Sequence, residues 1–390
     1  MSTIHDAVII GGGLVGSSLA LALGGNGLEV ALIEPRMLPP VAEGGRWDTR
    51  IYAISPGNAA FLETLGVWSR LDPRRVQRVE SMAIFGDANS GRLDLSAYDA
   101  GLRELAFIVE DGALQQAMRE AMSTVEGLRI FCPMQASGLA VSAGSARVTL
   151  ADETGIETRL VIGADGGDSW VRQAAGITAR TSDYQQIGVV ANFETSLPHH
   201  GTAFQWFRAD GVLALLPLPG KRTSMVWSTA VENAGNLLAL DMNALADTVT
   251  SASQHALGEL RPLTPAAGFP LRLTQVGRLV APRIALAGDA AHSVHPLAGQ
   301  GVNLGMRDIR ELAAVLASRL PRQDCGDWPL LRRYERARRE DIASIEFSTD
   351  ALQKLFAVRS VWVSGARNFG LAAVNRLPQL KNLLIRHAVS

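Results

Sequence analysis

Three glycine-bearing segments contain the residues whose types and spacing could do chemistry. In the first, residues 11–16 read Gly-Gly-Gly-Leu-Val-Gly, which matches the pattern G-x-G-x-x-G, and Glu34 follows eighteen residues after the last glycine. The first glycine of this pattern allows a tight turn, the second lets the backbone approach a pyrophosphate, and the third lets a helix pack closely on a sheet. The start of that helix presents unpaired N–H groups and a positive dipole end to phosphates. The segment therefore predicts a dinucleotide site, FAD or NAD, in which Glu34 binds the adenosine ribose and the turn is made by Gly11, Gly13, Leu14, Val15 and Gly16.

The second segment places Asp165 and Gly166 directly after an apolar run. Ser169 and Arg172 follow within the next six residues. An Asp-Gly turn in this context is either a ligand-binding turn or an ordinary connection from a strand to a helix. The residues alone leave both interpretations open.

The third segment, residues 288–308, carries the most chemical information. Asp289 stands where an apolar run gives way to a loop, and a carboxylate there can bind a polyol chain such as ribitol. Residues 299–301, Gly-Gln-Gly, open a long helical pattern, which predicts a second helix start able to hold an anion. Such a start, pointed at N1 and O2 of a reduced flavin, stabilises the negative charge there.

Two other kinds of site are not supported by this segment. His292 and His295 lie three residues apart in a turn, without further ligands in suitable spacing, so no metal site is predicted. Ser293 lacks the strand–turn–helix context of a nucleophile elbow, so no catalytic triad is predicted.

Apolar runs must position the three segments. Residues 7–10, 29–34, 160–165 and 283–289 are continuous rather than alternating, which is typical of parallel strands buried on both faces. Helical spacing follows in residues 14–23, and again near 56–65 and 112–122. Four short strands at 187–193, 203–207, 213–218 and 223–227 predict an inserted sheet, after which the chain from 300 onward is predicted to be helical.

Composition bounds the class of protein. The chain has 390 residues, of which 47% are hydrophobic and 19% charged, and this is typical of a globular protein. Its 37 basic and 38 acidic residues give a formal charge of −1, so no general positive field is available to bind nucleic acid. Cys132 and Cys325 have no metal-ligand spacing and indicate a reducing compartment. The uncharged residues 7–28 lack a basic start and contain seven glycines, which argues against a signal peptide or a membrane span.

In their order and spacing, the three segments resemble the class A flavoprotein monooxygenases, the group of para-hydroxybenzoate hydroxylase. More narrowly, residues 295–308, which read His-Pro-Leu-Ala-Gly-Gln-Gly-Val-Asn-Leu-Gly-Met-Arg-Asp, look like the signature of the ubiquinone-biosynthesis hydroxylases. Residues 48–54 and 331–336 add to the resemblance, which covers roughly residues 5–345.

The resemblance implies that the cofactor is FAD rather than NAD. It implies that Gly11, Gly13 and Gly16 surround the pyrophosphate, that Asp289 holds the ribitol and that Arg50 lies by the flavin. It links Asp165 and Gly166 to FAD and nicotinamide binding. The isoalloxazine ring would be flanked by Pro296, Gly299, Gln300, Gly301, Val302 and Asn303. The chain departs from the family at Glu110, where Arg or Gln often stands, so no flavin role is assigned there.

The resemblance also implies the architecture. We expect an α/β protein of the para-hydroxybenzoate hydroxylase type, with a Rossmann-like FAD-binding domain, an inserted mixed β-sheet substrate domain and a helical C-terminus. The FAD-binding domain would comprise residues 1–75, 106–182 and 276–345, and the substrate domain residues 76–105 and 183–275. Residues 346–390 would form the basic amphipathic helical C-terminus.

The activity implied is that of an FAD-dependent aromatic-ring monooxygenase. It would hydroxylate a prenylated phenol or quinone precursor in ubiquinone biosynthesis through a flavin C4a-hydroperoxide, with O2 as co-substrate and NAD(P)H as reductant. Strands 203–207 and 213–219 could form the dry wall of the substrate pocket, or only sheet core. Two alternative functions remain open, a class A hydroxylase of another phenol and a non-catalytic flavin-fold subunit of a biosynthetic complex. An NAD-dependent dehydrogenase would leave residues 289–303 unexplained.

The end of the chain has its own charge pattern. No acidic residue follows Asp350, whereas basic residues alternate with apolar ones: Lys354, Arg359, Arg367, Arg376, Lys381 and Arg386. Such a tail can lie on an anionic membrane, dock on a partner or pack on the flavin domain. With the resemblance, this leads us to expect a cytoplasmic protein, peripheral at the inner membrane, within a multi-enzyme ubiquinone-biosynthesis assembly.

Overall fold

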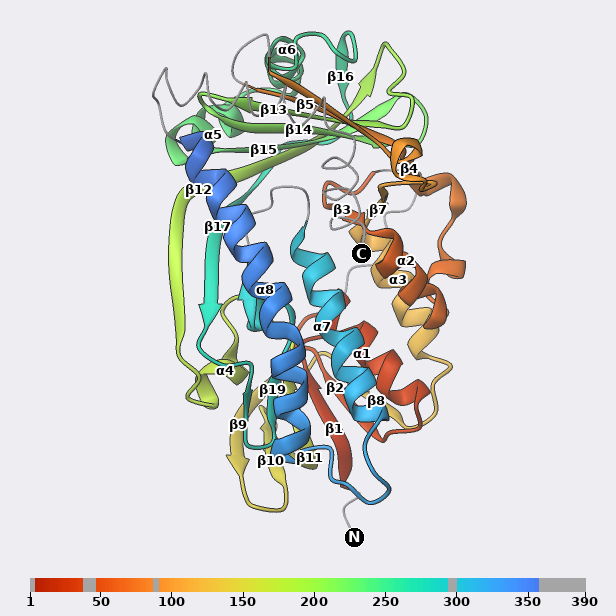
Figure 1. Ribbon diagram of the computed structural model, residues 1–390, viewed down its shortest axis with the longest axis vertical. Helices are drawn as coiled ribbons and strands as arrows, with labels where there is room; N and C mark the ends of the chain where they lie inside the picture. The colour runs from red at the N-terminus through yellow and green to blue at the C-terminus, as the bar shows by residue number, and fades with distance from the viewer. Residues whose placement is uncertain (1–3, 38–46, 87–90, 294–299, 358–390) are drawn as a thin grey trace.

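The chain folds around two large sheets, one in each half of the molecule (Figure 1). The computed structural model describes residues 4–37, 47–86, 91–293 and 300–357. Within these ranges the first sheet has eight strands, in the order β18-β19-β11-β1-β2-β8, with β10 beside β11 and β9 beside β10. Their bounds are β1 His5–Ile10, β2 Val30–Ile33, β8 Leu128–Phe131, β9 Ala136–Val141, β10 Ala146–Leu150, β11 Gly155–Gly163, β18 Val280–Ala281 and β19 Ile284–Leu286.

The centre of the first sheet is parallel and buried. Strand β1 pairs in parallel with β2 and β11, and β11 pairs in parallel with β19. These are the four strands predicted from continuous apolar runs. The sheet is packed by α1 Leu14–Gly25, α3 Asp111–Met122, α4 Trp170–Ala174, α7 Gln300–Ala317 and α8 Trp328–Ala357. In the described ranges, no helix combines the length and apolar character needed to cross a membrane.

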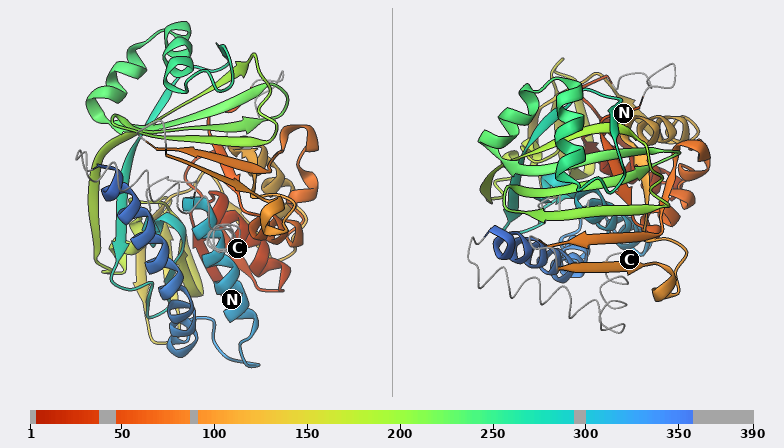
Figure 2. Two further views of the ribbon diagram at one scale, coloured as in Figure 1. Left: turned by 45° about the horizontal axis from the view of Figure 1, so that its top comes forward. Right: turned by 90° about the horizontal axis from the view of Figure 1, so that it is seen from above.

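The second sheet is mixed, as predicted. Its order is β20-β17-β12-β15-β14-β13-β5-β6, with β16 beside β12, and only the β13–β5 pair among the described strands is parallel. The bounds are β5 Ser81–Phe85, β6 Arg92–Ser96, β12 Ala179–Thr195, β13 Thr202–Arg208, β14 Gly211–Leu218, β15 Arg222–Ala230, β16 Leu260–Pro262, β17 Ala267–Val276 and β20 His292–Ser293. Helices α5 Val231–Ala239 and α6 Met242–Ala252, which the sequence analysis did not predict, lie over its outer face (Figure 2).

Residue alternation divides the second sheet into two faces. Trp206, Leu213, Trp227 and Val189 lie in register across four strands and pack under α5 and α6 in a buried cluster. Their sequence neighbours therefore point to the opposite, inner face, which is turned toward the first sheet. Half of the residues expected to line a pocket wall are thus core residues of the outer layer.

Two long strands join the halves. Strands β12 and β17, both of the second sheet, extend along one side of the molecule toward the first half (Figure 1). The expected boundaries at 182/183 and 275/276 fall inside these strands, and the expected boundary at 345/346 falls inside α8. Strand β12 has an irregular register between Asp183 and Gln186, where Gln185 takes a φ of 53°. An irregularity of this kind bends a strand and disrupts its ladder locally, and β12 pairs with β17 on both sides of it.

A small third sheet lies between the halves. It has the order β3-β7-β4, with β3 Ile51–Ile54, β4 Gln77–Val79 and β7 Ala106–Glu110. Helix α2 Pro56–Thr64 and the 3-10 turns η1 Trp68–Arg70 and η2 Pro73–Arg75 follow β3. Two more such turns are η3 Tyr98–Ala100 and η4 Gly288–Ala290.

Candidate functional site

The first glycine turn leaves one helix start open. Gly11 has a φ of +104°, and a Cβ there would lie 2.3 Å from the carbonyl oxygen of Ala164. A Cβ on Gly16 would lie 1.9 Å from the carbonyl oxygen of Gly11. Gly13, the N-cap of α1, has nothing within 4 Å of its Cβ position and no side chain caps the helix. Two glycines are therefore required by packing, and the third keeps space free beside unpaired N–H groups, which fits a phosphate ligand.

Glu34 reaches this turn from the end of β2. Its Oε2 accepts a hydrogen bond of 2.6 Å from the Gly12 N–H, and its Oε1 accepts one of 2.9 Å from the Arg36 N–H. A carboxylate has lone pairs for about four hydrogen bonds, so capacity for ribose hydroxyls remains. The structure thus brings Glu34 and the glycine turn together.

Asp165 holds the turn at its own helix. Its Oδ1 accepts a hydrogen bond of 2.6 Å from the Ser169 hydroxyl, and its Oδ2 accepts one of 3.1 Å from the Val171 N–H. The buried Arg172 donates from Nη2 to the Gly167 carbonyl (2.7 Å) and from Nη1 to the Ala290 carbonyl (2.9 Å). The second segment therefore ties itself to the third. Gly166, with a φ of +85°, makes the bend that directly follows Asp165.

The third segment meets the first through small residues. Gly288 has a φ of +61°, and its Cβ position lies 3.1 Å from the side chain of Val15. A Cβ on Gly305 of α7 would lie 2.8 Å from the same side chain. The start of α1, the turn η4 and helix α7 therefore converge. Among the described residues, Gly301 in the first turn of α7 has nothing within 4 Å of its Cβ position, so these residues leave space at this second helix start.

Several predicted residues near α7 serve the local fold. The buried Asn303 donates from Nδ2 to the Ala53 carbonyl (2.7 Å), and its Oδ1 accepts from the Ser55 N–H (2.9 Å). Val302 packs against the core of the first half. Pro296 and Gly299 lie outside the described residues, as does the side chain of Gln300. Since both ends of its side-chain amide are hydrogen-bonded within the protein, Asn303 would contact a flavin through its backbone.

Arg50 and Asp289 come from distant segments to one place. Asp289 follows β19 and is exposed, yet protein surrounds it on several sides, and the loss of hydration raises the pKa of its carboxyl. The positive charges of His292 and Arg50 oppose that rise. The Arg50 guanidinium lies 5.4 Å from the centre of the Tyr52 ring. An acid and a base from distant segments thus lie close enough to interact electrostatically.

Glu110, where the chain departs from the family, has a structural task. Its carboxylate is buried and accepts two hydrogen bonds from Arg75, of 2.7 and 2.8 Å. Its Oε1 also accepts one of 2.7 Å from the Asp48 N–H. The Arg75 guanidinium lies 4.4 Å from the ring centre of Trp47. Glu110 therefore fixes the loop that carries Arg50.

The inner face of the second sheet contributes two polar groups that sequence reasoning missed. Asn192 and Ser224 face each other across β12 and β15, and both are buried. The Asn192 Nδ2 donates to the Asp48 carbonyl at 2.8 Å, but its Oδ1 has no hydrogen-bond partner among the described residues, nor has the Ser224 hydroxyl. Buried polar groups are normally paired, so these two are candidates to bind a ligand. The sequence signal that could have revealed them is a polar residue at an inward-facing position of an otherwise apolar strand.

Apolar residues surround this pair on the same face. Val190, Ala214, Leu216 and Val226 retain partial exposure, whereas their outward neighbours are buried. An apolar surface with few convergent polar groups is typical of a small-molecule site.

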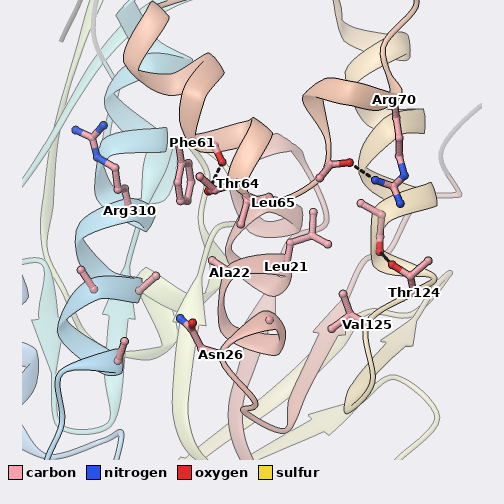
Figure 3. A pocket seen from close by; sticks show the side chains of 16 residues that line it. Leu21, Ala22, Asn26, Phe61, Thr64, Leu65, Arg70, Thr124, Val125 and Arg310 are labelled. Atoms are coloured by element: carbon pink, nitrogen blue, oxygen red, sulfur yellow. Dashed lines mark hydrogen bonds between the residues drawn. The ribbon is translucent and has the colours of Figure 1, made fainter.

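A separate cavity of about 570 Å³ lies elsewhere (Figure 3). The residues that line it include Leu21 and Asn26 at the end of α1, Phe61 of α2, Val125 after α3, and Arg310 of α7. It therefore adjoins the end of α1 opposite Gly13 and holds none of the predicted site residues. Among the described residues, no group of three His, Cys, Asp or Glu side chains could hold a metal ion, and His295 lies outside them.

Comparisons with known proteins agree on one family. A family model described as "FAD binding domain" matches residues 5–347. Ubiquinone hydroxylase UbiL of Rhodospirillum rubrum is 35% identical over 388 residues, which cover 99% of this chain and 90% of that protein. The 3-demethoxyubiquinol 3-hydroxylase of Escherichia coli is 32% identical and covers 98% of both chains. The crystal structure of Pseudomonas aeruginosa PqsL in complex with 2-aminobenzoylacetate has a TM-score of 0.80 at 22% identity, over 95% of this chain and 100% of that one, and shows the same fold.

Proposed function

The chain belongs to the FAD-binding domain family and to its ubiquinone-hydroxylase group, and we propose that it hydroxylates the aromatic ring of a prenylated phenol in ubiquinone biosynthesis. It is an FAD-dependent monooxygenase that uses O2 and NAD(P)H. The observation that carries the proposal is the identity to ubiquinone hydroxylases over nearly the whole chain. The start of α1, the turn η4 and helix α7 support it, since they converge at Val15, and Asp289 of that turn interacts with Arg50.

We propose tasks toward FAD for residues of all three predicted segments. The N–H groups after Gly13 bind the pyrophosphate, Glu34 binds the adenosine ribose, and Asp289 accepts hydrogen bonds from the ribitol. Asp165 and Gly166 shape the neighbouring turn, and the backbone from Gly299 to Asn303 would hold the flavin ring. Bound FAD supplies the redox chemistry by which one oxygen atom of O2 enters the substrate ring and the other leaves as water.

The inner face of the second sheet is proposed to hold the phenol. Val190, Leu216 and Val226 exclude water, which matters because water at the reacting centre would divert the oxygen to hydrogen peroxide. The Asn192 Oδ1 can accept a hydrogen bond from a ring hydroxyl, and the Ser224 hydroxyl can donate or accept one. These side chains would orient the ring carbon that is attacked.

We further propose where the protein works. A long prenyl chain keeps the substrate in a membrane, so we propose contact at the inner membrane through the basic residues 346–390, and membership in a biosynthetic assembly. Flotation of the full chain with anionic vesicles, compared with a chain ending at Ala357, measures that contact. Equal flotation of both chains would contradict it.

Turnover of the purified protein tests the activity. With NAD(P)H, isotopically labelled O2 and a short-prenyl phenol, one labelled oxygen atom should appear in the product by mass spectrometry. A yellow protein that consumes NAD(P)H and hydroxylates only phenols without a prenyl group would move the assignment to another phenol hydroxylase. A protein that binds FAD and gives no product with any phenol would favour a non-catalytic subunit.

A further inference from the structure

A buried network of charged side chains lies behind the turn that carries Asp289. Asp308 of α7 has no exposed surface. Its Oδ2 accepts a hydrogen bond of 2.9 Å from the Gly288 N–H and lies 2.6 Å from His292 Nε2. Its Oδ1 accepts one of 2.8 Å from Arg338 Nε of α8. One carboxylate therefore connects the cofactor turn, strand β20 and the C-terminal helix.

The network continues to the surface of α8. Arg338 donates from Nη1 to Asp341 Oδ2 at 2.6 Å, and Asp341 also binds Arg307 at 3.1 Å. Both arginine side chains are 6% exposed and the Asp341 side chain is 24% exposed. Buried charges are expensive unless they are paired, so each member depends on its neighbours.

The charge on His292 follows from the groups around it. Asp308 faces it from α7, Asp289 from η4 and Arg338 from α8, while β17 places the uncharged Gln275 opposite it. Burial is the largest single influence and opposes the imidazolium form, but the charge and the hydrogen bond of Asp308, together with the charge of Asp289, raise the pKa of His292. Burial likewise opposes the Asp308 carboxylate, but His292 and Arg338 lower its pKa. The contact between His292 and Asp308 therefore favours the charged form of this pair, next to the turn that carries Asp289.

Resting on the proposed function, we propose that His292 and Asp308 are positioning residues for FAD. Asp308 fixes the Gly288 amide and the His292 ring, and the His292 imidazolium keeps the neighbouring Asp289 ionised and oriented toward the ribitol. Neither side chain needs to touch FAD. An ionised carboxylate accepts stronger hydrogen bonds from hydroxyl groups than its protonated form does.

The proposal predicts how FAD affinity depends on pH. As the pH rises through the pKa of His292, the imidazolium is lost and the affinity of the apoprotein for FAD should fall. His292→Gln has no charge to lose, so it should bind FAD about tenfold more weakly at neutral pH and lack this alkaline decrease. Asp308→Asn should weaken binding in the same direction. His255→Gln is the matched control, because its side chain is 62% exposed and pairs with Glu259.

The experiment is a titration of apoprotein with FAD, followed by quenching of flavin fluorescence from about pH 6 to about pH 9. Near-ultraviolet circular dichroism establishes that each variant is folded. The proposal is overturned if folded His292→Gln binds FAD within twofold of the wild type and with the same pH dependence. If Asp308→Asn does not fold, His292→Gln still decides. A folded wild type that takes up no FAD would instead contradict the proposed function.

Discussion

The two turns proposed to hold FAD are built in different ways. The turn at residues 11–13 takes its shape from glycines that allow close packing, Glu34 and Ser17 are hydrogen-bonded to Gly12, and no side chain caps α1. The turn at residues 288–291 is held by side chains from three other elements, Arg172 of α4, Asp308 of α7 and, through Asp308, Arg338 of α8. The comparison teaches that an anion site needs bare N–H groups, whereas a carboxylate such as Asp289 needs an electrostatic support behind it.

The largest expected effect is a loss of bound flavin when the space beside the turn at residues 11–13 is filled. Gly13→Glu should abolish flavin retention, because the added side chain occupies the open space beside the helix start and repels phosphates. The matched control is Gly25→Glu at the other end of α1, where the Cβ position also has nothing within 4 Å. Absorbance of the purified proteins near the flavin bands measures retention. A yellow Gly13→Glu protein would remove this turn from the site.

A change to the side chains that hold the turn at residues 288–291 should lower the free energy of unfolding. Arg338→Met removes a buried partner of Asp308 and should lower the free energy of unfolding by about 3 kcal/mol. Arg92→Met removes an ion pair with Asp94 whose arginine side chain is 59% exposed, and should change it by less than about 0.5 kcal/mol. Urea unfolding of both variants gives the two values. Equal costs would mean that ion pairing does not support the 288–291 turn.

The same network should shape the dependence of stability on pH. The folded state raises the pKa of His292, so its stabilisation is complete below the unfolded pKa of about 6.5 and is lost as the pH rises through the folded pKa. The pKa of Asp308 is lowered, so its stabilisation is present above the unfolded pKa of about 3.9 and is lost as the pH falls through the folded pKa. Urea unfolding at several pH values should show both losses in the wild type. The loss of stability at alkaline pH should be smaller in His292→Gln. The same loss in this variant as in the wild type would contradict a charged His292.

The smallest expected effect is a change in the KM for the phenol, which depends on the substrate site and on neither turn. Ser224→Ala removes a hydroxyl with no partner among the described residues, so stability and FAD affinity should stay unchanged. The KM for the phenol should rise about two- to tenfold, the value of one neutral hydrogen bond. Asn236→Ala, an exposed change on α5, is the control. A rise in KM that is equal in both variants would exclude Ser224 from the substrate site.

The contrast between the turns also explains what the sequence could reveal. The first turn was predictable because the positions of Gly11, Gly13 and Gly16 directly encode its geometry, and the four central parallel strands were predictable from their apolar runs. The side chains that hold the second turn could not be predicted, because Arg338 lies fifty residues from Gly288 and no local sequence pattern pairs it with Asp308. Helices α5 and α6 were missed since the apolar strands around them dominated the pattern. Asn192 and Ser224 needed the register of β12 and β15 to be seen as one pair.

Quinone profiling by mass spectrometry in a strain that lacks this gene tests the central claim most directly. The strain should accumulate a prenylated intermediate that lacks one ring hydroxyl, and this intermediate names the carbon attacked. The intact copy should restore ubiquinone, and a copy carrying Gly13→Glu should not. Unchanged ubiquinone in a deletion strain that holds no redundant hydroxylase for the same ring position would contradict a role in ubiquinone biosynthesis.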